Sequence, residues 1–426
     1  MKSKPPAHIL AALEALQLQS PSTARLELLS PLDQQRFFEW CDSRQISLLL
    51  PYICSSAPDW VIEGAISRAS RYDTRFERIK RKLYEIADAF DRAGLPFVML
   101  KGLSHSPALT PHAALRAQGD IDLWLPGDSA YKGWNILAGL GYVPVVKSES
   151  RHLPPLTRIS NWKWRGDLFD PDMPISVELH HELWSEAAEH IPAPGLEQFW
   201  HRAELRDFDG HLIKVLCDQD LIAFAALHLL LHLLHGELPL QRAWELARFL
   251  DTHADDGAFW HSWRNFHPLA LRQLQVCMFH LLIRWFNTKG WNNFHNELQA
   301  LPPMIRNWLR TYSFAPIERE WKANKSELWL HLSLICEWRK QLSVFLRRLL
   351  PLALPLFTDQ ARPATSKASR IAAVIRQLPM LFSRLLRHTR TFLPTLLGGV
   401  RWTVTQRSAI RCERNAMDRA ISDSLR

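Results

Sequence analysis

Glycine is distributed unevenly along this chain of 426 residues, and the distribution limits where tight turns can lie. Seven of the 16 glycines fall between residues 94 and 141, at positions 94, 102, 119, 127, 133, 139 and 141. Overall, glycine makes up about 4% of the chain against about 7% of average proteins. Elsewhere the apolar residues recur every three or four positions, which is the spacing of amphipathic helices. We therefore expect a predominantly helical α+β protein with a small α/β core where the glycines gather.

Helical periodicity surrounds the glycine-rich segment on both sides. Before it, helices are predicted over residues 8–18, 32–44 and 74–94, and Gly94 is the predicted stop of the last one. From about Pro192 the chain returns to helix, over residues 221–235, 240–250 and 271–286. The basic C-terminal segment is also expected to be helical, with breaks at the prolines at 351, 355, 363, 379 and 394.

Between these flanks lie short apolar runs, which are typical of strands buried on both faces. Strands are predicted over residues 95–100, 121–125 and 142–146, with a short helix over 128–140. A hairpin is predicted from 162–169 and 174–179 around a turn at 170–173. The sequence thus divides into an N-terminal helical region (1–92), a mixed-sheet α/β core (93–190), a helical domain (191–337) and a basic helical segment (338–426).

The segment GDIDLWL, residues 119–125, places two carboxylates on one face of a strand. Side chains alternate along a strand, so Asp120 and Asp122 share a face with Trp124, while the residues between them are apolar. Such neighbouring carboxylates repel each other unless water or a cation compensates, and Mg²⁺ binds one or two carboxylates together with substrate phosphates. The simpler alternative is a solvated edge strand with two surface aspartates. Trp124 suits a core or interface position better than stacking on a base.

A third carboxylate and a glycine turn strengthen the cation interpretation. In PISVELHHEL, residues 174–183, Glu178 and His180 share the polar face of a predicted strand. Upstream, the strand that ends at Lys101 runs into Gly102 and a short helix or loop. Backbone amides at such a turn suit an anion such as a triphosphate.

Taken together, these motifs resemble those of a known family. The order is a strand followed by L-K-G and a helix, then R-x-x-x-D-I-D-L, a G-Y after the next helix, and an E-L-H strand. This order is similar to that of the bacterial uncharacterised nucleotidyltransferases, which belong to the polymerase-β-like superfamily. The resemblance covers Leu95 to Leu183 and extends more loosely into the helices that follow.

The resemblance implies a metal-dependent transfer of NMP from an NTP such as ATP, with release of pyrophosphate. It implies that Asp120 and Asp122 hold Mg²⁺ or Mn²⁺, and that Glu178 binds a metal and helps to deprotonate the acceptor hydroxyl. The residues implied for phosphate binding are Lys101, Gly102, Ser104 and Arg116. The acceptor stays open between a protein side chain, a small metabolite, a sugar, a peptide and an RNA end.

Two departures from the wider superfamily concern the phosphate turn. Gly102 is followed by Leu103 where Gly-Ser or Gly-Gly is usual, so the next hydroxyl is that of Ser104. The interval between Gly102 and Asp120 is also longer than in compact members. A second hypothesis is a catalytically inactive protein of the same fold, which acts as a binding or scaffold protein.

Three histidines, His228, His232 and His235, fall on one face of the predicted helix 221–235. Such spacing can ligate zinc, but the glutamate of H-E-x-x-H is missing and the helix is rich in leucine. Structural or interdomain histidines are the favoured interpretation, ahead of a role beside the transfer site and of a metal site. The six cysteines include no C-x-x-C pair, which argues against a zinc ribbon or a disulfide framework.

Positive charge is concentrated at the C-terminal end of the chain. The net charge is +9, yet residues 338–426 alone contain 17 Lys and Arg against 4 Asp and Glu. Basic amphipathic helices of this kind can pack on the body, lie on an anionic membrane surface or contact nucleic acid, in that order of preference. A signal peptide is not expected, and no uncharged run reaches the roughly 18–20 residues that span a bilayer. We expect a cytoplasmic protein, with peripheral contact at the inner face of the membrane as an option.

Overall fold

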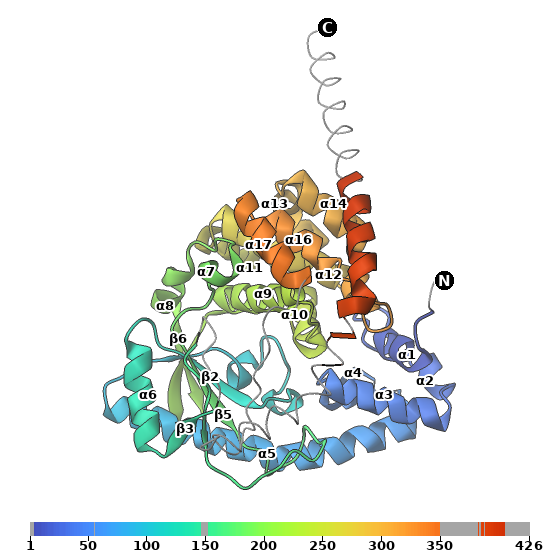
Figure 1. Cartoon of the computed structure of the whole chain (residues 1–426). Helices are drawn as coiled ribbons and strands as arrows, with labels where there is room; N and C mark the ends of the chain where they lie inside the picture. The colour runs from blue at the N-terminus through green and yellow to red at the C-terminus, as the bar shows by residue number, and fades with distance from the viewer. Residues whose placement is uncertain are drawn as a thin grey trace.

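The computed structural model describes residues 4–54, 56–145, 152–349, 382, 385, 386 and 388–404. It has an α/β core embedded in helices, so the predicted fold class, a predominantly helical α+β protein with a mixed sheet, is confirmed (Figure 1). The N-terminal helices are α1 (Ala7–Ala15), α2 (Ala24–Glu27), α3 (Pro31–Ser43), α4 (Leu50–Ile53) and α5 (Asp59–Arg92). Gly94 has a φ of +61° just beyond α5, which confirms the predicted helix stop.

Seven strands form one mixed sheet in the order β3-β4-β5-β2-β1-β7-β6. The strands are β1 (Val98–Met99), β2 (Asp120–Trp124), β3 (Tyr142–Pro144), β4 (Leu156–Arg158), β5 (Ser176–His180), β6 (Glu204–Phe208) and β7 (His211–Val215). Strand β2 pairs in parallel with β5 and antiparallel with β1, and β1 pairs in parallel with β7. The parallel β2–β5 pair is therefore the centre of the core that carries the predicted carboxylates.

The two faces of the β2–β5 pair have different surroundings. Apolar residues such as Leu123 and Val177 pack on α5 and on α6 (Ser129–Gly139) in one buried cluster. The polar face carries Asp122 and Glu178, and the helices α9 (Asp218–His235) and α10 (Leu240–Thr252) lie on the side of the sheet opposite α5 (Figure 1). The alternation predicted from the sequence thus directs the carboxylates toward the helical region.

The predicted hairpin strand at 162–169 is wrong. The strand that pairs with β5 is β4, Leu156–Arg158, and residues 162–169 form no strand. Side-chain hydrogen bonds hold this segment in turns instead: the Trp162 indole donates to Asp170 at 2.8 Å, and the Phe169 amide donates to the Asp167 carboxylate at 2.9 Å. Hydrogen bonds to aspartate side chains compete with the backbone pairing of a sheet. In this segment they replace that pairing, and no strand forms.

A second correction concerns residues 204–215, which fall in the part of the chain predicted to return to helix. Strands β6 and β7 form a hairpin there, and β7 joins the sheet next to β1. Asp209 and Gly210 at the turn have φ values of +53° and +90°. Asp-Gly between two alternating segments is a strong hairpin signal, and it outweighs the helical surroundings.

The remaining helices form the body above the sheet. They are α7 (Glu186–Glu189), α8 (Phe199–Arg202), α9, α10, α11 (Gly257–Phe266), α12 (Leu269–Phe286), α13 (His295–Gln299), α14 (Pro303–Tyr312), α15 (Ala315–Glu318), α16 (Glu327–Leu334) and α17 (Trp338–Leu349). The predictions over 221–235, 240–250 and 271–286 are confirmed as α9, α10 and α12. The buried apolar residues of these three helices belong to the largest apolar cluster among the described residues.

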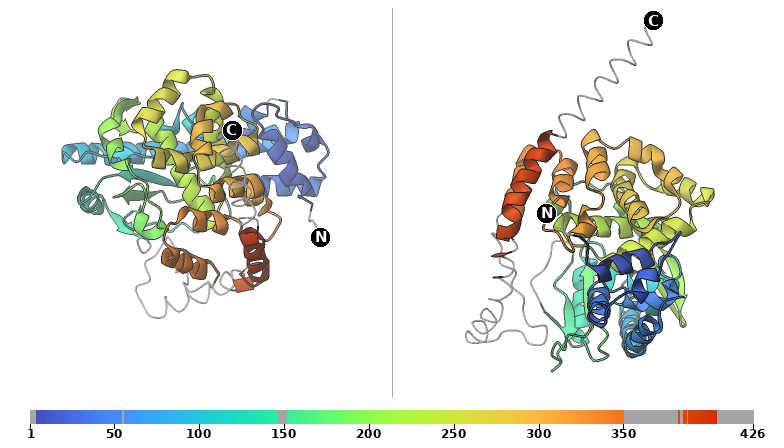
Figure 2. Two further views of the ribbon diagram at one scale, coloured as in Figure 1. Left: turned by 90° about the horizontal axis from the view of Figure 1, so that it is seen from above. Right: turned by 90° about the vertical axis from the view of Figure 1, so that its right-hand side faces the viewer.

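Residues 388–404 are helical and stand against the side of this helical body (Figure 2). Pro394 lies inside this stretch, so the break predicted there is wrong. The prolines at 351, 355, 363 and 379 lie outside the described residues. Among the helices that the structure describes, none is both long and apolar enough to cross a membrane.

Candidate active site

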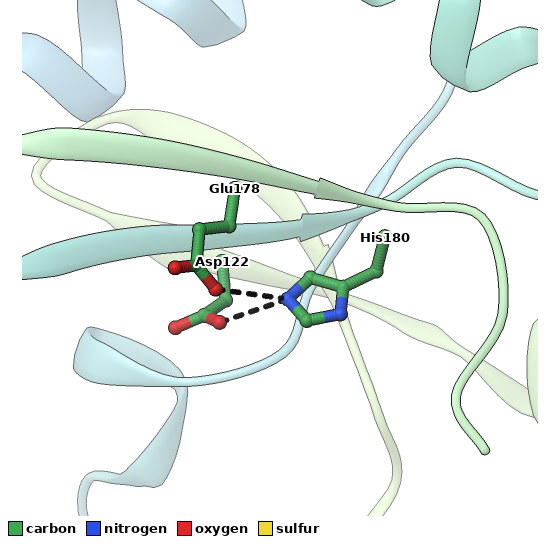
Figure 3. A group of neighbouring side chains, drawn as sticks. All are labelled: Asp122, Glu178 and His180. Carbon is green, nitrogen blue, oxygen red and sulfur yellow. Dashed lines mark hydrogen bonds and ion pairs between the residues drawn. The ribbon is translucent and has the colours of Figure 1, made fainter. Parts of the chain in front are cut away.

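Strands β2 and β5 bring two carboxylates side by side. Their parallel register pairs Asp122 with Glu178, although 56 residues separate the two positions in the chain. His180 lies two residues after Glu178 on the same face, and Figure 3 shows its ring pointing at both carboxylates. One ligand atom from each of the three residues lies within 4.8 Å of the others. Two strands thus supply a compact group of two carboxylates and one imidazole.

Asp122 is buried and is held by two donors. The Lys101 ammonium donates to its Oδ1 at 2.6 Å, and the His180 Nε2–H donates to the same oxygen at 2.9 Å. Burial by itself raises the pKa of Asp122, but Lys101 and His180 together hold that pKa well below its usual range. Burial also lowers the pKa of His180 to about 4, so the imidazole is neutral. Asp122 is therefore a carboxylate at any pH near neutrality.

Glu178 has the opposite electrostatic environment. Burial, together with the negative charges of Asp122 and Asp120, raises its pKa to about 7. The nearest imidazole nitrogens, of His180 and His152, lie 3.7 and 3.9 Å from its Oε2. Glu178 is thus poised to gain or lose a proton near neutral pH.

Asp120 lies on the same face of β2, opposite Ser176, and is not part of the three-residue group. Its carboxylate makes no hydrogen bond to another residue that the structure describes. Burial and the charge of Asp122 raise its pKa, while the charge of Lys101 opposes the rise. The three predicted carboxylates are thus on one surface, with Asp122 and Glu178 closest together.

The glycine turn begins directly after β1. Gly102 has a φ of +76°, and a Cβ there would lie 2.5 Å from Oε1 of Gln118, so only glycine fits without strain. Residues Gly102–His105 form a single 3₁₀ turn. The Ser104 hydroxyl is buried and has no hydrogen-bond partner among the described residues. An unsatisfied buried hydroxyl beside such a turn is compatible with a ligand contact.

Arg116 is buried and forms an ion pair with a carboxylate on α10. Its Nε lies 3.3 Å from Oε1 of Glu245 on α10, and His105 lies 3.3 Å from the other oxygen of that carboxylate. Burial by itself raises the pKa of Glu245, but Arg116 and His105 hold that pKa below its usual range. Arg116 therefore joins the segment before β2 to the helical body.

One protein family matches the chain: the uncharacterised nucleotidyltransferases, over residues 30–287. The chain belongs to this family. The match covers more than half of the sequence and extends on both sides of the segment that carries the motifs, so it includes α3 to α12. No curated protein and no solved structure matches the chain.

One cation that acts on these carboxylates, Arg242, was not predicted from the sequence. Arg242 on α10 donates through Nη1 to Nε2 of His232 at 3.0 Å and to Nδ1 of His228 at 3.1 Å. Its pKa is lowered by burial and by the charge of Arg116, and Asp120 and Asp122 oppose that effect. The two histidines of the predicted face thus hold an arginine whose charge acts on Asp120 and Asp122. Their spacing is visible in the sequence, but the arginine between them is not.

The third histidine of that face has a different partner. His235 bonds Glu189 at 3.0 Å, which ties the end of α9 to α7. Among the described residues, the group that could hold a metal ion consists of Asp122, Glu178 and His180, and none of the three helix histidines belongs to it.

The donor set at this site fits a divalent cation. Mg²⁺ and Mn²⁺ bind carboxylate oxygens, and Mn²⁺ also accepts an imidazole. The acidic site, by which we mean Asp120, Asp122 and Glu178, offers three carboxylates against the ammonium of Lys101 and the nearby charge of Arg242. A buried surplus of negative charge is costly unless a cation balances it. The residues present therefore suit the metal that nucleotidyltransferases generally use.

Proposed function

We propose that the protein transfers NMP from an NTP to a hydroxyl group of an acceptor. The observation that carries this proposal is the parallel pairing of Asp122 with Glu178 beside the Lys101–Gly102 turn. Membership of the nucleotidyltransferase family supports an NTP as substrate.

In the proposed reaction the acceptor oxygen attacks the α-phosphorus, and the bond to the pyrophosphate leaving group breaks. Asp120, Asp122 and Glu178 would hold the metal ions, which stabilise charge on the attacking and leaving oxygens when they are bound. Glu178 suits proton transfer because its pKa of about 7 lies near the working pH, and its carboxylate would take the hydroxyl proton.

The phosphates would lie against the turn at Gly102. There the backbone is opened by the positive φ, and the Ser104 hydroxyl is available to a ligand. Lys101 neutralises Asp122 at 2.6 Å, and a bound cation would take over that role and free the ammonium for a phosphate. Arg116 is the weakest of the phosphate-binding proposals, because its charge is already paired with Glu245.

The test is transfer of label from α-labelled NTP in the presence of cell lysate, which supplies acceptors. The double variant Asp120→Asn plus Asp122→Asn is expected to abolish Mg²⁺- or Mn²⁺-dependent labelling. The exposed Asp128, just beyond β2, offers a matched control as Asp128→Asn. Undiminished labelling by the double variant would overturn the site assignment.

The alternative is a catalytically inactive binding or scaffold protein. The Lys101–Asp122 ion pair favours it, because it already neutralises one proposed metal ligand. Calorimetry with each NTP and Mg²⁺ separates the two proposals. Binding of none of the four NTPs by folded protein would favour the scaffold.

A peripheral membrane contact is a second proposal. It is favoured by the helical residues 388–404, whose inward and outward sides differ in polarity. Their small and polar side packs inward: Thr391 and Thr395 are buried, and Gly399 lies against Trp329. The outward side is apolar, with exposed fractions of 61% for Leu393, 53% for Leu397 and 64% for Val400. With the exposed Arg401 at its C-terminal end, this face suits an anionic bilayer surface.

Co-sedimentation with vesicles tests this contact. Replacing Leu393, Leu397 and Val400 by Ser is expected to abolish binding to vesicles that contain phosphatidylglycerol, while neutral vesicles bind neither protein. Equal sedimentation of wild type and variant would exclude this face as the contact. A cytoplasmic location is likewise a proposal.

A further inference from the structure

A large cavity lies among the helices, and Arg242 is one of its lining residues. Its volume is about 860 Å³. Its walls come from the end of α3, from the α9–α10 connection, from α15 and α16, and from the helical residues 388–404. Small-molecule sites have volumes of about 300–1,000 Å³, so the space suits a metabolite-sized ligand. We call it the basic cavity because of its lining.

Cations outnumber carboxylates along the walls of the basic cavity. The lining cations are Arg44, Arg242, Arg319, Lys322, Lys325 and Arg390. The lining carboxylates are Glu237, Glu320 and Glu327. Each of these carboxylates is already engaged, with His232 at 2.7 Å, Arg44 at 2.6 Å and Arg319 at 2.9 Å, respectively.

Four cations remain after that pairing, and one of them, Lys322, is paired at 2.7 Å with Glu318, which does not line the cavity. Arg242, Lys325 and Arg390 form no ion pair with a carboxylate among the described residues. Lys325 donates to the Arg348 carbonyl at 3.1 Å, and burial together with the charge of Arg348 lowers its pKa to about 8. Burial and the charge of Arg348 both disfavour the charged ammonium, and an anion bound beside it would stabilise that charge.

Arg242 lines this cavity, and its charge also acts on Asp120 and Asp122 of the acidic site. Besides the basic cavity, it lines a small hollow of about 10 Å³ whose other walls include Lys101 and Arg116. Its Nε is buried and has no hydrogen-bond partner among the described residues, while its Nη1 is fixed by His228 and His232. A guanidinium fixed at one nitrogen and unsatisfied at another is prepared to bind an anion.

The basic cavity is distinct from the glycine turn. Lys101, Gly102 and Ser104, which would receive the phosphates of the NTP, do not line it. Arg242 lines the basic cavity, and it also lines the small hollow together with Lys101, which is assigned to the nucleotide under the proposed function.

We propose that the basic cavity is the acceptor site and that the acceptor is a phosphorylated small molecule with a free hydroxyl group. The acceptor role rests on the proposed function. The presence of an anion-binding site in the cavity does not depend on it. The phosphate would be bound by Lys325 and Arg390, and Arg242 would position the inner end of the molecule near Asp122. Arginine and lysine are the side chains that bind phosphate most strongly.

The test uses isothermal calorimetry on the full chain, with glycerol 3-phosphate and inorganic phosphate as probes and no metal. Wild type is expected to bind both. Lys325→Gln plus Arg390→Gln is expected to weaken binding of both probes by about tenfold for each cation removed. Affinity for ATP with Mn²⁺ is expected to stay within about twofold, because neither residue lies at the proposed nucleotide site. Lys132→Gln on α6 removes an exposed charge that does not line the cavity and serves as the control.

Two results would overturn the proposal. The first is undiminished phosphate binding by the double variant, with its thermal unfolding unchanged. The second is an equal loss of ATP and phosphate affinity, which would assign the cavity to the nucleotide. Phosphate binding that behaves as expected in a protein that neither binds NTP nor transfers label would support the cavity and reject the proposed function, so the two failures can be told apart.

Discussion

The acidic site and the basic cavity carry surplus charge of opposite sign, and Arg242 lines the cavity while its charge acts on Asp120 and Asp122. In the acidic site, three carboxylates face the ammonium of Lys101 and the charge of Arg242, whereas six cations, Arg242 among them, and three carboxylates line the basic cavity. Buried charge is costly unless it is paired. A divalent cation would balance the first region and a phosphorylated ligand the second. Unbalanced charge can thus mark two ligand sites where only one carries a recognisable motif.

The largest effect is expected from Glu178→Gln, which removes one proposed metal ligand and the proposed base. The rate of labelling from α-labelled NTP should fall by about 10³-fold or more. Glu186→Gln, at an exposed position of α7, is the matched control. A rate for Glu178→Gln within tenfold of the control would mean that the acidic site is not where the transfer occurs.

The second prediction concerns Glu245, the buried carboxylate that faces Arg116 and His105. It tests whether Glu245 is the counter-charge that holds Arg116. Glu245→Gln leaves Arg116 buried without a counter-charge, so the free energy of unfolding in urea should fall by about 3 kcal/mol. Glu63→Gln on the exposed side of α5 should leave it unchanged. If both variants are equally stable, Arg116 is not held by Glu245, and its role as a phosphate ligand becomes the better interpretation.

The pH dependence of metal binding tests the environment of Glu178. Because its pKa is about 7, a metal must displace a proton below that pH. Mn²⁺ affinity should therefore fall by about tenfold for each unit below pH 7 and level off above it. Calorimetry in two buffers of different ionisation enthalpy should detect about one proton released at pH 6. An affinity that does not change between pH 6 and pH 8 would contradict a ligand role for Glu178.

The smallest effect is expected at the glycine turn. Gly102→Ala places a Cβ 2.5 Å from Gln118 at a φ of +76°, so the free energy of unfolding should fall by about 1–2 kcal/mol. A Cβ at Gly139 in α6 would meet no atom outside its own helix within 4 Å, so Gly139→Ala should leave stability unchanged or raise it slightly. Equal stability of the two variants would show that the turn tolerates a side chain and that its conformation is not fixed.

Much of the acidic site could be predicted from local pattern. The alternation in DIDLW and in SVELH places Asp120, Asp122 and Glu178 on polar strand faces, and both segments are strands with that alternation. The direct pairing of Asp122 with Glu178 could not be predicted, since register depends on how strands far apart in the chain meet. The role of Arg242 was also beyond prediction, because it arises where α9 and α10 pack together.

The errors have local causes as well. The segment 162–169 has a strand-like pattern, but Asp167 and Asp170 direct it into turns. The hairpin at 204–215 was not predicted despite the Asp209–Gly210 signal, and its strand β7 completes the sheet beside β1. The division of the chain at residues 92, 190 and 337 stays a prediction. Two strands of the sheet, β6 and β7, come from beyond residue 190.

Binding of Mn²⁺ measured by electron paramagnetic resonance, in the presence of ATP, tests the central claim most directly. We predict stoichiometric binding by the wild-type protein, and its loss in Asp122→Asn but not in Asp128→Asn. Asp122→Asn protein that remains folded and binds Mn²⁺ as tightly as wild type would contradict the claim that these strand carboxylates form the metal centre of a nucleotidyltransferase.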